Sequence, residues 1–565
     1  MKISKTSISG ITPFLHALCG KTPLRPLRLS SECLPQMHRF SSSLPRYGYR
    51  AFRATVIELF EIRLSSLPRY AYLNVSIATL SPNLMRKTWI ALALLLSSSP
   101  LLAQKKGTKT DPLKQSVQQT IDARFADMTK LSDQIWAFEE IAFQETQSSA
   151  ALSAYAEELG FKVTRGVGEI PTAFVAEYGS GAPIIGILGE FDALPGLSQN
   201  KVPFKSPLND GAPGHGCGHN LFGVASLSAA AAVKDLIAAG KLKGTVRFYG
   251  TPAEEKFFGK LWMIRAGIMN DVDVMLDWHP ADETKTEVQK GLALVDFIVE
   301  FKGQAAHASA DPWNGRSASD ALELYTSGIN YYREHIKPTV RIHYHIQDGG
   351  QVVNVVPDYS RLWVRVRDTS REGLMPVWKR VEEMAQGAAI LANVEHQVTL
   401  VSGVHEILVN RRGSEVMQSN LETLGPISYT EEEQAFAKKI QEATGKPQIG
   451  VVSEIKPLEE TLEHSMGGST DVGDVSWVVP TIRMGASTAP NGTPWHSWAV
   501  VASGGMSIGH KGMGYAAKAL AMTMVDLFQN ETLRTEIKAE FKQKKGDYVY
   551  KGIVPDRPPP LNAGY

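Results

Sequence analysis

Cysteine is rare in this chain: the 565 residues include three, at positions 19, 33 and 217. So few thiols cannot form the disulfide framework of a small secreted protein. A serine hydrolase is also unsupported, because no G-x-S-x-G elbow follows an apolar strand. The glycines of "GGSTDVGDVSW" (467–477) lack the Lys-Ser/Thr of a phosphate-binding loop, so we expect a loop that faces a substrate instead.

A concentrated basic region is missing from most of the chain. Residues 1–87 contain 13 Lys and Arg against three acids, whereas the rest contains 46 basic and 55 acidic residues, a net charge of −9. A nucleic-acid-binding face would need clustered basic residues, so we expect no nucleic-acid partner. The length favours two domains, and the 43% hydrophobic and 21% charged residues are typical of a soluble globular protein.

One long apolar run lies near the N-terminus, in "MRKTWIALALLLSSSPLLAQ" (85–104). A basic start, an apolar centre and a small-residue end are typical of a secretory signal peptide and too short for a spanning helix. We therefore expect a signal peptide over 85–103, an exported protein and no membrane span in the mature form; a buried core helix is the alternative. Residues 1–84, in which "SSLPRY" occurs twice, are interpreted as a misassigned upstream extension or, alternatively, a long targeting presequence.

Cleavage after Ala103 would leave Cys217 as the sole cysteine of the mature protein. A single thiol outside the cytosol needs a reason such as metal ligation, catalysis or simple burial. It lies in "GHGCGHN" (214–220), where glycines allow unusual backbone angles around Cys217 and His219. The two side chains can therefore converge on one point.

Apolar strands alternate with helical segments before and after the middle of the chain, which predicts an α/β fold with a mixed, mostly parallel sheet. Strands are expected near 172–178, 183–188, 245–250 and 271–280, and helices near 115–160, 221–239 and, as the last one, 513–529. Polar motifs follow several of these strands, which is where open α/β sheets build their sites.

The pattern changes between residues 291 and 404. A strand with period-two alternation at 294–303 is the first element of a β-α-β-β-α-β order, which predicts an inserted ferredoxin-like domain. The expected organisation is therefore a catalytic domain in two parts, 104–290 and 405–565, with the 291–404 domain between them.

Six side chains in or next to these motifs are candidate metal ligands or acid–base groups. They are Cys217, His219, Glu254, Glu255, His279 and His496. Each alone is more simply explained as a surface or core residue, but their concurrence at strand ends favours a metal site. Thiolate, imidazole and carboxylate together suit zinc, manganese, cobalt or nickel, whereas calcium and magnesium prefer oxygen ligands.

The stretches "GHGCGHN", "GEFDALPG" (189–196), "PAEE" (252–255), "DWHP" (277–280) and "PWHSW" (494–498) resemble the M20 family of metallopeptidases and amidohydrolases, most closely its subfamily D. The resemblance extends over about residues 115–530. It implies a Zn-peptidase-like catalytic domain, with the inserted domain serving for dimerisation.

The resemblance assigns a role to each candidate. Cys217, His219, Glu255, His279 and His496 match metal ligands, and Cys217 would bridge two divalent ions. Glu254 matches the general base, and Asp192 an acid that orients a ligand. Glu190 stands where the wider family has a metal-binding histidine, which leaves one metal position open.

The inserted domain matches further functional elements of the family. His307, in "GQAAHAS", would reach across a homodimer and stabilise the oxyanion of the neighbouring site; capping the helix near 317 is the alternative. Asn354 and Arg367 match substrate-carboxylate groups, and an arginine suits a carboxylate because its planar fork donates two bonds. A plain surface position is the alternative for Arg367.

The activity implied is metal-dependent hydrolysis of the amide bond of an N-acyl or N-aroyl amino acid, with aminobenzoyl-glutamate as the leading candidate. An exported dipeptidase or carboxypeptidase with the same site is the first alternative, and a non-catalytic binding protein of the same fold is the second. The family likeness also leaves open whether an A-type subunit joins the homodimer.

Overall fold

The computed structural model describes residues 111–462 and 467–562, which belong to one compact unit spanning 108–565. The predicted upstream extension and signal peptide, with Cys19 and Cys33, lie outside the described residues. Those expectations therefore stay predictions.

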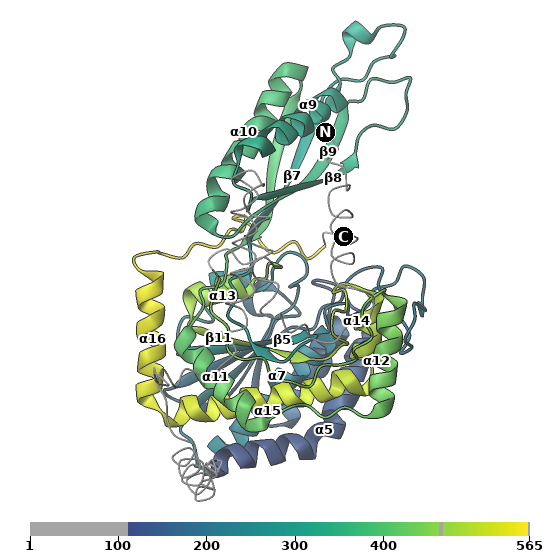
Figure 1. Cartoon of the computed structure of the whole chain (residues 1–565). Helices are drawn as coiled ribbons and strands as arrows, with labels where there is room; N and C mark the ends of the chain where they lie inside the picture. The colour runs from purple at the N-terminus through teal and green to yellow at the C-terminus, as the bar shows by residue number, and fades with distance from the viewer. Residues whose placement is uncertain (1–110, 463–466, 563–565) are drawn as a thin grey trace, which may run out of the picture. The chain divides into compact units, whose positions relative to one another are not determined.

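A mixed sheet, which includes β5 and β11, forms the centre of the larger domain (Figure 1). It has seven strands in the order β1-β2-β4-β3-β5-β11-β6. Its strands are β1 (Lys162–Arg165), β2 (Phe174–Ser180), β3 (Ile184–Gly189), β4 (Gly244–Gly250), β5 (Val274–Ala281), β6 (Lys285–Thr286) and β11 (Thr481–Ser487). The four central strands β4, β3, β5 and β11 run parallel, and the outer ones pair antiparallel. The predicted mixed α/β sheet is confirmed.

Helices cover both faces of this sheet. They are α5 (Pro112–Phe138), α6 (Thr146–Glu158), α7 (His219–Ala238), α8 (Lys260–Arg265), α11 (Arg411–Leu424), α12 (Glu431–Ala443), α13 (Val472–Val478), α14 (Trp498–Gly504), α15 (Ser507–Gln529) and α16 (Glu531–Lys545). Neighbouring strand residues serve opposite faces: Ile187 packs in the cluster of α5, α7 and α15, whereas Leu188 packs with α8 and α13. Burial on both faces explains why the parallel strands read as continuous apolar runs.

Helix α7 is central to the larger core. It starts at His219, two residues earlier than expected, so that His219 occupies its first turn. Within residues 111–462 and 467–562 it alone is long and apolar enough to cross a membrane. However, 78% of its apolar 18-residue stretch is buried inside the protein. Its alanines at 229–232 bring it close to α5 and α15. It is therefore the core helix of the larger domain.

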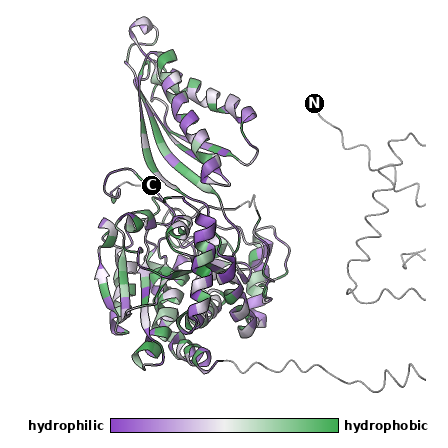
Figure 2. Cartoon of the chain, turned by 90° about the vertical axis from the view of Figure 1, so that its left-hand side faces the viewer, coloured by the Kyte–Doolittle hydropathy of each residue, from purple (hydrophilic) through white to green (hydrophobic). Residues whose placement is uncertain are grey.

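The smaller sheet has four antiparallel strands in the order β10-β7-β9-β8. Its elements are β7 (Ala293–Lys302), α9 (Ala318–Tyr332), β8 (Arg341–Asp348), β9 (Tyr359–Asp368), α10 (Arg371–Ala392) and β10 (Glu395–Val404), with short 3-10 turns at Pro312–Asn314 and Arg333–His335. Helices α9 and α10 pack on apolar residues of β7 and β9, a core separate from that of the larger sheet, and Figure 2 shows hydrophobic residues along these strands. The expected β-α-β-β-α-β order is confirmed.

One expectation about the C-terminal region is wrong. Helix α15 is followed by α16, which begins at an Asn530 cap that accepts a hydrogen bond from the Leu533 amide. Leu533 and Ile537 are the buried residues of this helix, and charged residues are frequent in the rest of it. A narrow apolar stripe gives little periodic signal, which is why the pattern did not reveal it.

Candidate active site

The candidate residues meet at the carboxyl ends of the central parallel strands. Glu190 and Asp192 follow β3, Glu254 and Glu255 follow β4, and His279 lies near the end of β5. The segment carrying His496 follows β11, and the N-terminus of α7 brings Cys217 and His219. Parallel strands place these ends at one edge of the sheet, as expected for an α/β site.

The Cys217 thiol lies at the centre of this group. Its Sγ is 3.3 Å from Nε2 of His279 and 3.6 Å from Nε2 of His496. Gly218 has φ +77, and a Cβ there would lie 2.9 Å from the Pro280 side chain, so only glycine fits the turn that holds the thiol.

Two sets of potential ligand atoms share this sulfur. Cys217, His219 and His279 form one set, and Cys217, Glu255 and His496 form the other, each within 4.8 Å. Nε2 of His496 is 3.5 Å from Oε2 of Glu255. Because the sulfur belongs to both sets, the arrangement fits two cations bridged by one thiolate.

Buried atoms without partners give an independent test of whether a metal fits. Within the described residues, Nε2 of His219, Oε1 of Glu255 and Oε2 of Glu190 are buried without a hydrogen bond. Nε2 of His219 and Oε2 of Glu190 are 3.0 Å apart yet lack hydrogen-bond geometry. Burying unpaired polar atoms costs about 1–3 kcal/mol each, so the set is explained by ligation. Sulfur, nitrogen and oxygen donors suit a borderline divalent ion.

Asp192 holds one ligand of each set. Its Oδ1 accepts from Nδ1 of His219 at 3.0 Å, and its Oδ2 accepts from the Glu255 amide at 3.0 Å. Complete burial favours a raised pKa for Asp192, but hydrogen bonds and the charge on His219 keep its pKa below the usual value. It therefore stays a carboxylate that holds both residues, and its role in orienting metal ligands stays a prediction.

Glu254 is buried beside the two sets that share the sulfur, and with Glu190 and His219 it forms a third group of potential ligand atoms within 4.8 Å of one another. Burial raises its pKa well above the usual value, and the carboxylates of Glu190 and Glu255 raise that pKa further. Ala253, just before it, has φ +62, a strained angle for a residue with a side chain. A carboxylate with a raised pKa at a fixed position is suited to general base catalysis.

Glu145 supports that strained turn and was not identified from the sequence. Its Oε1 accepts from the Ala253 amide at 2.9 Å, and its Oε2 accepts from the Thr172 hydroxyl at 3.1 Å. No motif contains it, and only its contact with a segment 108 residues away gives it a role.

A buried lysine is the second group that sequence reasoning missed. Nζ of Lys260 lies 2.6 Å from Oε1 of Glu190 and 2.6 Å from Oδ1 of Asp471. Burial favours a lowered pKa for Lys260, but these two carboxylates raise its pKa above the usual value, so it remains charged. Its position in the apolar stretch "FFGKLWMI" (257–264) was the available signal.

A cavity of about 570 Å³ opens beside the site. Cys217, Glu254 and Arg367 line it, together with residues 467–470 of the glycine-rich loop. The loop therefore faces the cavity, as expected. Arg367, on β9 of the smaller sheet, shares the cavity with the ligand sets.

His307 and Asn354 lie together in loops of the smaller domain. His307 forms a β-bridge with Val355, and the Ala308 amide donates to the Asn354 carbonyl at 3.0 Å. Neither residue lines the cavity beside Cys217. Their action at a site on a second copy of the chain stays a prediction.

Comparison with known proteins gives a consistent result. The model of "Peptidase family M20/M25/M40" matches residues 186–497. The chain is 37% identical to one of the two subunits of p-aminobenzoyl-glutamate hydrolase of Escherichia coli, over 79% of this chain and 98% of that protein. It is 30% identical to a human Xaa-Arg dipeptidase, over 78% of this chain and 95% of that protein. A crystal structure of a dinuclear metal-binding M20 peptidase from Bacillus subtilis matches with a TM-score of 0.50 and 19% identity. The match covers 72% of this chain and 99% of that chain.

Proposed function

Because the chain belongs to peptidase family M20/M25/M40 and is a metal-dependent amidohydrolase, we propose that it cleaves aminobenzoyl-glutamate to aminobenzoate and glutamate. The supporting observation is that Arg367 lines the same cavity as Glu254 and Cys217. A carboxylate-binding group and a general base therefore face one bound molecule.

The chain's own residues account for the steps of amide hydrolysis. A bound divalent cation supplies Lewis-acid chemistry that makes water acidic and polarises the amide carbonyl. Glu254 takes a proton from the attacking water at its carboxylate and delivers it to the departing amine nitrogen. Arg367 donates two parallel hydrogen bonds to the substrate carboxylate and thereby fixes the amide over Glu254.

The proposal extends to two ions, zinc or manganese, with cobalt or nickel as alternatives. Cys217, His219 and His279 would hold one ion, and Cys217, Glu255 and His496 the other. The donor chemistry supports this set. In a homodimer formed through the smaller domain, His307 of one copy would stabilise the oxyanion at the other site, and Asn354 would assist in binding the carboxylate.

We further propose export of the protein, because 85–103 has the composition of a signal peptide. The enzyme would then scavenge its substrate outside the cytoplasm. Sequencing the N-terminus of the mature protein tests this; Gln104 is the expected first residue, and any residue before Met85 contradicts it. The relative from Escherichia coli is named as one subunit of a hydrolase that has two, so an A-type partner is part of the proposal.

A dipeptidase acting on Xaa-Arg substrates is less well supported. The cavity already contains Lys290 and Arg367, two cations with no carboxylate partner in the described residues. An arginine side chain would add a like charge at this place, which disfavours binding.

A substrate panel with measured metal content tests the proposed function. Protein loaded with zinc or manganese should release glutamate from 4-aminobenzoyl-glutamate with a kcat/KM at least about 100-fold above that for Xaa-Arg dipeptides. Metal content by elemental analysis accompanies each assay. Faster cleavage of dipeptides, or no glutamate release from fully loaded protein, would overturn the proposal.

A further inference from the structure

Most cations that line the active-site cavity already have a carboxylate partner. Lys285 pairs with Glu287 at 3.2 Å. Arg365 pairs with Asp296 at 2.6 Å, and Arg483 pairs with a carboxylate of the larger sheet at 2.9 Å. These three charges are neutralised within the protein.

Two cations of the same cavity have no carboxylate partner within residues 111–462 and 467–562. They are Lys290 and Arg367. Nε of Arg367 is buried without a hydrogen-bond partner in that part of the chain. Burial and the charge of Arg365 lower the pKa of Arg367, as expected for a cation held without a counter-charge. Two positive charges are therefore available to a ligand.

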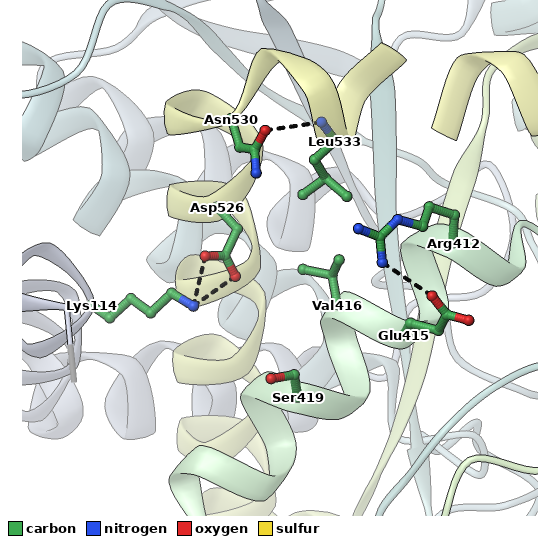
Figure 3. Close-up of a pocket in the computed structure, with 8 residues that line it drawn as sticks. All are labelled: Lys114, Arg412, Glu415, Val416, Ser419, Asp526, Asn530 and Leu533. Carbon is green, nitrogen blue, oxygen red and sulfur yellow. Dashed lines mark hydrogen bonds and ion pairs between the residues drawn. The ribbon is translucent and has the colours of Figure 1, made fainter. Parts of the chain in front are cut away.

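A pocket elsewhere on the larger domain shows the opposite pattern (Figure 3). There, Lys114 contacts Asp526 at 2.7 Å and Arg412 contacts Glu415 at 3.1 Å, both as dashed lines in the picture. Both cations of that pocket are paired. That pocket therefore offers a ligand no unpaired cation, whereas the active-site cavity offers two.

A backbone hydrogen bond holds Lys290 near β7, the strand that pairs with the Arg367 strand β9. The Lys290 carbonyl accepts from the Ile407 amide at 2.7 Å, and β7 begins three residues later. Within the smaller sheet, Leu294 of β7 lies opposite Arg367 of β9, and Leu294 also lines the cavity. The backbone of the half-buried Lys290 is therefore held close to the start of β7, and Lys290 lines the same cavity as Arg367.

We propose that Lys290 binds the side-chain carboxylate of the amino acid to be released, while Arg367 binds its α-carboxylate. The enzyme then selects N-acyl amino acids that carry an acidic side chain. The inference rests on the proposed function, since it names the group that sets the preference at the same site. A point-like ammonium suits one carboxylate oxygen, whereas the guanidinium fork suits a bidentate contact.

The test compares 4-aminobenzoyl-glutamate with 4-aminobenzoyl-glutamine, which differ in the side-chain charge alone. Lys290→Met should lower kcat/KM for the glutamate substrate by about 10- to 100-fold, mostly through KM, and change that for the glutamine substrate less than about threefold. Lys290→Arg should retain most of the preference. Lys302→Met, an exposed lysine at the end of β7, should change neither value. Equal losses on both substrates, or no loss, would overturn the role of Lys290.

Binding separates this inference from the proposed function. Calorimetry with the Glu254→Gln variant measures the affinity for each of the two amides without turnover. Tighter binding of the glutamate amide, abolished by adding Lys290→Met, supports Lys290 even if the wild-type protein hydrolyses neither compound. If that substitution leaves the ratio of the two affinities unchanged, the inference is wrong whatever the activity.

Discussion

Two buried histidine–aspartate pairs differ in whether the second ring nitrogen of the histidine, Nε2, has a hydrogen-bond partner. At the proposed metal site, Nδ1 of His219 lies 3.0 Å from Oδ1 of Asp192. In the second pair, Nδ1 of His405 lies 2.7 Å from Oδ1 of Asp474. Nε2 of His405 is hydrogen-bonded to the Tyr548 hydroxyl at 2.9 Å. Nε2 of His219, by contrast, has no hydrogen-bond partner in the described part of the chain. The same two residue types thus form an open site in one place and a closed network in the other.

The closed network links the C-terminal tail to the junction of the two domains. The Tyr550 hydroxyl donates to Oδ1 of Asp474 at 2.8 Å, and the His405 amide donates to Oδ2 at 3.0 Å. The Arg371 guanidinium stacks on the rings of Trp477 and Tyr548. Saturated hydrogen bonding indicates a structural role. His405 lines the active-site cavity, yet its ring nitrogens are already occupied.

The largest effect expected at the open site follows from removing the proposed general base. Glu254→Gln should lower kcat on the substrate by about 10²- to 10⁴-fold, because the amide cannot take a proton from water. Metal content by elemental analysis should stay unchanged, since Glu254 lies outside the two sets that share the sulfur. Glu415→Gln, on the surface of α11, is the matched control and should retain full activity. Loss of metal from the Glu254 variant would mean that this residue is a ligand instead.

A paired substitution compares the two aspartates directly. Asp192→Asn should weaken the apparent metal affinity by about 10- to 100-fold, because His219 and Glu255 both lose the group that orients them. Asp474→Asn should leave metal affinity unchanged and lower the free energy of unfolding by about 2 kcal/mol, because His405 loses a charged partner. Competition with a chromophoric chelator measures the first quantity and urea denaturation the second. Equal metal affinities in the two variants would contradict the conclusion that Asp192, and not Asp474, supports metal binding.

The sequence predicted the cysteine and histidine of the open site but not the buried lysine beside it, for a physical reason. Cys217 and His219 are two residues apart, and glycine spacing makes their convergence visible in a single motif. Lys260 and Asp471 are 211 residues apart, and their pairing depends on the packing of α8 against α13. No local pattern encodes such a contact.

The fold follows the same division between local and long-range information. Periodicity predicted β2, β3, β4 and β5 of the larger sheet and the four strands of the smaller one, because alternating or continuous burial is a local property. It did not predict β1, β6 or β11. Helix α16 escaped prediction, since burial of Leu533 and Ile537 depends on surfaces supplied by distant segments. His405 carried no recognisable motif, and its partner Tyr548 lies 143 residues away.

The smallest effect is expected where the closed network meets the C-terminal tail. Tyr548→Phe removes the hydroxyl from Nε2 of His405 and leaves that buried nitrogen unsatisfied, which should lower the free energy of unfolding by about 1 kcal/mol. Urea denaturation measures this loss, and Tyr331→Phe, 75% exposed on α9, is the matched control with no expected change. Metal affinity should equal that of the wild type, because the network shares no atom with the two ligand sets. A drop in metal affinity with Tyr548→Phe would instead mean that the closed network transmits the position of the tail to the metal site.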